Sequence, residues 1–186
     1  MRIMCAVEDS VLWLRTMSPL AMANLRREAK ERGVSPHRLI FAPRLEERSH
    51  HLARLRLMDI FLDTTPYNGH ATACDALWAG VPVITCPGST FPGRVAASLL
   101  HAIEMPELIA SSFLEYERLA RLLARDPEML AAAKKKLSLK KQSAPLFDTA
   151  AFTRNLEAAY TEMWARQHDG LPPATFSVAA QYSRTS

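Results

Sequence analysis

Several features that mark other classes of protein are missing from this 186-residue sequence. No apolar run approaches the roughly 20 residues that a membrane-spanning helix requires, and no signal peptide precedes the first expected element. The only cysteines are Cys5, Cys74 and Cys86, and their spacing does not match that of metal ligands. The sequence therefore predicts a cytoplasmic protein with reduced thiols and no membrane association.

The positive charges are not gathered into a surface for nucleic acid. The net charge is +4 and the isoelectric point is near 9.1, but 23 Lys and Arg residues are dispersed among 19 acidic residues. The lysine-rich run over 134–141 lacks the interleaved aromatic side chains that stack on bases. We expect no nucleic-acid partner, although this charge would tolerate a diphosphate ligand.

What the sequence does contain is an alternation of short apolar strands and helices. Strands are expected at 11–14, 39–42, 60–62 and 83–85, with helices at 21–32, 50–57, 70–80 and 94–103. This order predicts an α/β fold, a Rossmann-like parallel sheet with helices on both faces. A helix end over 1–6, a short edge strand at 108–109 and C-terminal helices over 113–125, 127–143 and 152–164 complete the expected elements. Residues 1–168 would form this domain, and 169–186 a disordered tail.

The last expected helix carries a stripe of large apolar side chains. Its members are Phe152, Leu156, Tyr160, Met163 and Trp164. A stripe of this size requires a partner surface, so we expect self-association of the chain through this helix.

Residues 62–88 organise the rest of the chain. An apolar strand runs into a turn rich in Pro, Gly and small polar residues, and the following helix ends at Gly80. Gly69 lets the backbone approach a ligand, and Thr72 offers a hydroxyl beside the free N–H groups of the first helical turn. Such a turn suits a phosphate group. The same residues could simply form the turn and N-cap that any α/β protein has.

A detailed motif runs through this stretch. It reads Leu62-Asp63-Thr64, Asn68-Gly69-His70-Ala71-Thr72, Asp75, Leu77-Trp78-Ala79-Gly80 and Pro87-Gly88. The motif resembles the C-terminal catalytic half of the O-linked N-acetylglucosamine transferases and their SPINDLY-like relatives, and the similarity extends from Val11 to Trp164. The resemblance implies the C-terminal, donor-binding half of a two-domain glycosyltransferase. Such a half binds UDP-N-acetylglucosamine, for transfer to Ser or Thr hydroxyls of proteins, without requiring a metal or other cofactor.

The same resemblance assigns the turn and the start of the helix to the donor. In the family, the positions of Gly69, His70, Ala71 and Thr72 hold the diphosphate, and that of Asp75 lies near the ribose. Asp75 follows Thr72 by three residues, so both lie on one helix face and could contact one ligand.

A second group of candidates comes from the preceding helix. Arg48, His51 and Arg54 are spaced i, i+3, i+6, which places them along one ridge near the end of the second strand. In the relatives, a basic residue, a histidine and an arginine at these positions line the nucleotide pocket. One extra residue just before them leaves His50 as an alternative to His51. A merely solvated helix face is the other interpretation.

Departures from the family pattern leave the activity open. Ala71 stands where the family usually has the first of two threonines, and Ser89 replaces a usual glutamate. The other nucleotide-binding half, the acceptor-side residues, the usual catalytic lysine and the tetratricopeptide repeats are expected outside this chain, so no catalytic residue is named. The alternatives are a catalytically inactive nucleotide-binding or scaffold remnant and an unrelated α/β nucleotide binder.

Overall fold

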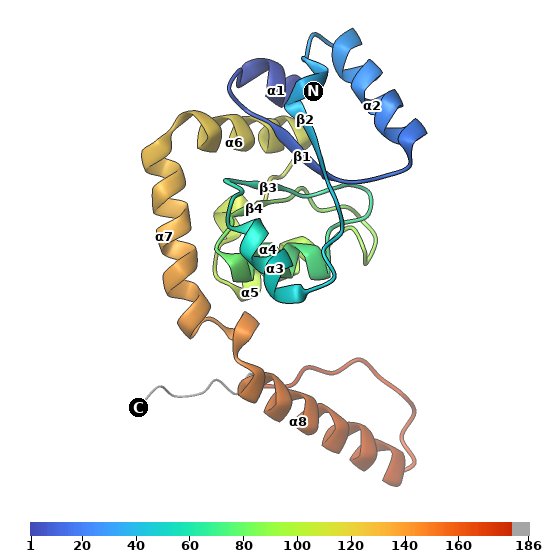
Figure 1. Cartoon of the computed structure of the whole chain (residues 1–186). Helices are drawn as coiled ribbons and strands as arrows, with labels where there is room; N and C mark the ends of the chain where they lie inside the picture. Colours follow the sequence, from blue (N-terminus) through green and yellow to red (C-terminus); the bar gives the residue numbers. More distant parts are fainter. Residues whose placement is uncertain (180–186) are drawn as a thin grey trace.

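Parallel strands joined through helices form the framework of the computed structural model, which describes residues 1–179 (Figure 1). β1 (Leu12–Arg15) pairs with β2 (Leu39–Ala42), and β3 (Phe61–Leu62) pairs with β4 (Val83–Ile84). The predicted α/β fold with parallel strands is confirmed. Within residues 1–179, however, the named strands form two separate two-stranded sheets rather than one continuous sheet.

The strands are short because residues that cannot continue a ladder follow them closely. Pro43 comes directly after β2, Pro66 lies in the turn after β3, and Pro87 comes three residues after β4. The expected edge strand at 108–109 is reduced to a single bridge between Thr85 and Ile109. Its first residue belongs instead to the 3-10 turn η2 (Pro106–Leu108), because Pro106 favours the start of a turn.

Helices connect the strands and extend the chain beyond them. They are α1 (Arg2–Ala6), α2 (Pro19–Glu31), α3 (Arg48–Leu55), α4 (Ala71–Ala79), α5 (Val95–Ala102), α6 (Phe113–Arg125), α7 (Pro127–Ser143) and α8 (Thr149–His168), with short 3-10 turns η1 (Pro36–Arg38) and η3 (Pro145–Phe147). The starts of α2, α6, α7 and α8 are capped by the side chains of Ser18, Ser112, Asp126 and Asp148, each of which accepts a backbone N–H bond.

The main core lies around α4, β4 and α5. Leu77, Ile84 and Leu100 are fully buried there, and α6 and α7 add Leu123 and Leu137. A smaller cluster packs α1 and α2 against β2. The turn between β3 and α4 is therefore attached to the more extensively packed part of the molecule.

The last helix, α8, extends away from the strands and packs against η3 (Figure 1). Its stripe is exposed, with Phe152 at 65%, Tyr160 at 59% and Trp164 at 69%. The described part of the tail runs back beside α8 (Figure 1), and Arg166 donates a hydrogen bond to the carbonyl of Pro172 at 3.0 Å. The expected disordered tail was 169–186, and its last part, 180–186, lies outside the described residues. None of the helices within residues 1–179 is long and apolar enough to cross a membrane.

Candidate functional site

The turn between β3 and α4 is held by the carboxylate of Asp63. Its Oδ1 accepts a hydrogen bond from the Gly69 backbone N–H at 2.6 Å, and its Oδ2 accepts one from the Thr85 hydroxyl at 2.6 Å. Within the turn, the Asn68 side chain donates to the carbonyl of Thr64 at 2.9 Å. Asp63 is 7% exposed. Burial raises the pKa of its carboxyl above the ordinary value, and the bonds from Thr85 and Gly69 oppose part of that rise.

The start of α4 leaves no room for a side chain at position 69. A Cβ atom on Gly69 would lie 2.8 Å from the Thr72 Oγ1 atom and 3.4 Å from the Ala73 Cβ atom. The N-cap residue of α4, His70, makes no side-chain capping bond, and Ala71 and Thr72 are exposed. The first N–H groups of α4 therefore point toward a surface that a ligand can reach.

His70 belongs to a small aromatic cluster instead of capping the helix. Its ring stacks on Tyr67 with centroids 4.8 Å apart, and Phe91 approaches edge-on at 6.2 Å. The His70 Nε2 atom lies 3.4 Å from the Pro92 carbonyl oxygen. These contacts join the turn before α4 to the loop before α5, so the two loops form one surface.

The predicted basic residues of α3 lie beside α4. Arg48 donates a hydrogen bond to the Asp75 Oδ1 atom at 3.1 Å, and the His51 Nε2 atom lies 3.9 Å from the Asp75 Oδ2 atom. Arg54 instead donates to the Pro43 carbonyl at 2.6 Å and lies over the Trp13 ring at 5.5 Å. The packing of α3 against α4 thus brings Asp75 close to Arg48, which lies 27 positions earlier in the sequence, and to His51, which lies 24 positions earlier.

A cavity of about 500 Å³ opens at the carboxyl ends of β1 and β2. His51, Arg54 and Thr72 line it, together with Trp13, Arg15 and Arg44, whereas His50 is exposed and is not among the lining residues. Gly69, His70 and Ala71 do not line it and lie beside it, at the start of α4. Ligands of open α/β folds bind at this end of the strands.

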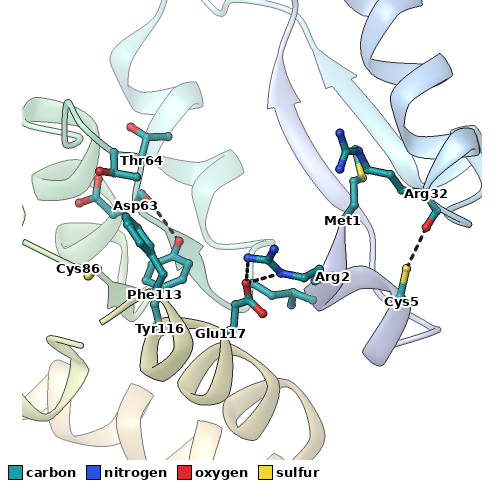
Figure 2. Close-up of a pocket in the computed structure, with 12 residues that line it drawn as sticks. Met1, Arg2, Cys5, Arg32, Asp63, Thr64, Cys86, Phe113, Tyr116 and Glu117 are labelled. Carbon is teal, nitrogen blue, oxygen red and sulfur yellow. Dashed lines mark hydrogen bonds and ion pairs between the residues drawn. The ribbon is translucent and has the colours of Figure 1, made fainter. Parts of the chain in front are cut away.

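A second, larger cavity of about 680 Å³ lies between α1, α6 and the turn after β3 (Figure 2). None of the eight predicted site residues lines it. Its ionic side chains are already engaged, since Arg2 pairs with Glu117 and Arg32 with Glu28. Charge therefore favours the smaller cavity for an anionic ligand, although size favours the larger one.

Asp63, which holds the turn before α4, also lines the larger cavity. The Tyr116 hydroxyl, on α6, donates a hydrogen bond to the Asp63 carbonyl at 2.9 Å (Figure 2). Burial and the nearby Asp63 charge raise the pKa of Tyr116, which therefore stays protonated and remains a donor. Within residues 1–179, no three His, Cys, Asp or Glu side chains gather closely enough to hold a metal ion.

The fold is that of a glycosyltransferase domain. It is similar to the solved structure of a mutant O-GlcNAc transferase from Thermobaculum terrenum, with a TM-score of 0.84 and 34% sequence identity. The similarity covers 91% of this chain and 33% of that one. Residues 1–156 match the model of glycosyl transferase family 41, and the chain belongs to that family. The family resemblance read from the motif at 62–88 is confirmed.

Relatives with known names agree with this assignment. The chain is 35% identical over 166 residues to a UDP-N-acetylglucosamine–peptide N-acetylglucosaminyltransferase of Caenorhabditis elegans, covering 89% of this chain and 14% of the relative. It is 39% identical over 173 residues to the probable enzyme SEC of Arabidopsis thaliana, covering 92% of this chain and 18% of the relative. The chain thus spans less than a fifth of the length of these two relatives.

Proposed function

We propose that this chain is the donor-binding half of a protein O-GlcNAc transferase, which binds UDP-N-acetylglucosamine for transfer to Ser or Thr hydroxyls of proteins. One observation carries the proposal. Helices α3 and α4, which are separate in sequence, place His51, Arg54 and Thr72 around a single cavity beside the exposed start of α4. The positions that the family uses for its donor are therefore neighbours in this chain.

The chemistry of these groups divides naturally between the parts of a sugar nucleotide. The N–H groups at the start of α4, its helix dipole and the Thr72 hydroxyl suit the diphosphate. The Asp75 carboxylate suits the ribose hydroxyls. Donors directed at the diphosphate would also stabilise the negative charge that develops as it leaves the sugar. Arg48 donates a hydrogen bond to Asp75, so a cation that suits phosphate and a carboxylate that suits sugar hydroxyls lie next to each other.

Unsatisfied buried donors also support a polar ligand at this cavity. The Trp13 Nε1 and Arg54 Nε atoms are buried and have no hydrogen-bond partner among residues 1–179. Both residues line the cavity of about 500 Å³. Because a buried donor without a partner is costly, a ligand or water that accepts these bonds would stabilise the site.

The rest of the enzyme would come from outside this chain. The family's facing nucleotide-binding half, its acceptor residues and its tetratricopeptide repeats would belong to other sequence, since the similarity covers only 33% of the matched solved chain. We place the assembled enzyme in the cytoplasm, with a protein acceptor and without a metal ion.

Replacing Asp75 with alanine is expected to weaken the NMR response to uridine diphosphate. Two or three charge-assisted hydrogen bonds at about 1.5–3 kcal/mol each barely offset an association cost of about 4–15 kcal/mol. Binding to the isolated chain should therefore be no tighter than about the millimolar range. In a titration of the wild type, amide shifts should cluster over 69–75, and Asp75→Ala should reduce them.

The matched control for this titration is Asp59→Ala. Neither aspartate lines the cavity, and each forms an ion pair. Asp75 lies 3.9 Å from the cavity-lining His51, whereas Asp59 pairs with Lys134 at 2.9 Å. This control should leave the shifts unchanged. A wild type that shows no shifts at millimolar ligand would contradict donor binding and favour the inactive remnant.

The exposed stripe of α8 leads to a second proposal, that two copies of this chain associate through it. Sedimentation velocity should detect dimers or larger species, because five large apolar side chains lie in water on one helix face. The double substitution Tyr160→Glu with Met163→Glu should return the chain to a monomer. Leu139→Glu, which changes a single exposed apolar side chain on α7, should not. A clean wild-type monomer would contradict the proposal.

A further inference from the structure

A buried network connects Asp63 to three separate parts of the chain. Its carboxylate binds the Gly69 N–H and the Thr85 hydroxyl, and its carbonyl accepts the Tyr116 hydroxyl. Its own N–H donates to the Ile84 carbonyl at 3.0 Å. Asp63 thus ties the turn before α4 to the end of β4 and to α6.

The short bond to Gly69 is the one that bears on the ligand site. Gly69 lies three residues before Thr72, which carries the first exposed hydroxyl of α4, and a Cβ on Gly69 would approach the Thr72 Oγ1 atom to 2.8 Å. The Gly69 backbone therefore lies close to the Thr72 side chain, with no space for a side chain of its own between them. Fixing the Gly69 N–H also fixes the direction in which the chain enters α4.

A carboxylate is a costly residue for a purely structural role at this position. At 7% exposure it loses most of its hydration, and its two carboxylate hydrogen-bond partners, the Gly69 N–H and the Thr85 hydroxyl, are neutral groups. The raised pKa of Asp63 agrees with that cost. A buried polar network whose groups are hydrogen-bonded holds the segments that it joins in one specific arrangement, which offsets the desolvation of the carboxylate.

We infer that Asp63 is a positioning residue of the donor site, which contacts no ligand and holds the Gly69–Thr72 turn in the geometry that accepts the diphosphate. The inference rests on the proposed function. Thr85 orients the Asp63 carboxylate from the end of β4, so it acts one step further from the ligand. Neither residue belongs to the eight positions for which the family resemblance implies donor contacts.

The test compares Asp63→Ala, Asp63→Asn and Thr85→Val with the wild type in the full chain. The probe is uridine diphosphate, and the readouts are the Gly69 amide resonance, its hydrogen exchange and the ligand-induced shifts over 69–72. In Asp63→Ala, the Gly69 resonance should move upfield, its exchange should speed up by about tenfold or more, and the ligand-induced shifts should fall about tenfold at a fixed subsaturating concentration.

The conservative variant separates positioning from general stability. In Asp63→Asn, the amide oxygen can still accept from Gly69 and the amide nitrogen can donate to Thr85, so most of the response should return. Thr85→Val should give an intermediate loss. Leu137→Ala, which truncates a fully buried side chain on α7 that takes no part in the Asp63 network, should lower stability without changing the Gly69 signals or the ligand response.

The outcomes distinguish this inference from the proposed function. A folded Asp63→Ala chain with wild-type Gly69 signals and ligand response would overturn the positioning role. So would an equal loss in Leu137→Ala. A wild type that does not respond to uridine diphosphate would overturn the proposed function itself, whereas the Gly69 resonance and exchange would still decide whether Asp63 holds the turn.

Discussion

Gly69→Val should abolish the response of the chain to uridine diphosphate. A Cβ at this position would lie 2.8 Å from the Thr72 Oγ1 atom, and the second branch of valine would increase the crowding against Ala73. The conflict is relieved only if the Thr72 side chain rotates or the first turn of α4 shifts. Either change moves a group that is proposed to bind the diphosphate. NMR titration with millimolar ligand should then show no shifts over 69–75.

Gly88→Ala provides the matched control. A Cβ on Gly88 would meet nothing closer than 3.8 Å, and this residue lies in the exposed loop after β4. Its ligand response should therefore equal that of the wild type. An unchanged response in Gly69→Val, measured on a folded chain, would contradict the assignment of the diphosphate to this turn.

Leu77→Ala should cause a large loss of stability. Leu77 is fully buried on the inner face of α4, within the main core. Truncating a buried leucine removes apolar burial and leaves a cavity, and this typically lowers the free energy of unfolding by about 2–5 kcal/mol. Urea denaturation followed by circular dichroism would measure the change.

The exposed Leu57 allows the same substitution without the cavity. Its side chain is 78% exposed, so Leu57→Ala should change the free energy of unfolding by less than about 0.5 kcal/mol. Similar losses for the two variants would contradict the placement of the core under α4. That placement matters for function, because Leu77 anchors the helix whose first turn carries Thr72.

The features that the sequence predicted well depend on neighbouring residues. The starts of α6 and α7 follow from Ser112 and Asp126, whose side chains cap N–H groups three residues away. The start of α8 was expected at residue 152 and lies instead at Thr149, after the capping residue Asp148. The end of α4 follows from Gly80, whose φ of 87° places it in the left-handed region. Local rules of this kind, together with apolar periodicity, were sufficient for the α/β class and the order of its elements.

Strand pairing was less predictable because it depends on distant backbone geometry. The pattern of apolar residues locates Phe61–Leu62 and Val83–Ile84, but it does not say how many strands join in one sheet. The edge strand expected at 108–109 fails for a local reason, the turn at Pro106, and only its tertiary pairing with Thr85 remains.

Motif and periodicity are properties of order along the chain, so they were sufficient to predict the fold class, the family and the candidate donor residues. Which of those residues meet depends on the three-dimensional packing. Arg48 reaches Asp75 across 27 positions, and Tyr116 reaches Asp63 across 53. Asp63 and Thr85, 22 positions apart, come together because β3 and β4 run in parallel and end side by side. No spacing rule relates residues so far apart, because their contact depends on how strands and helices pack.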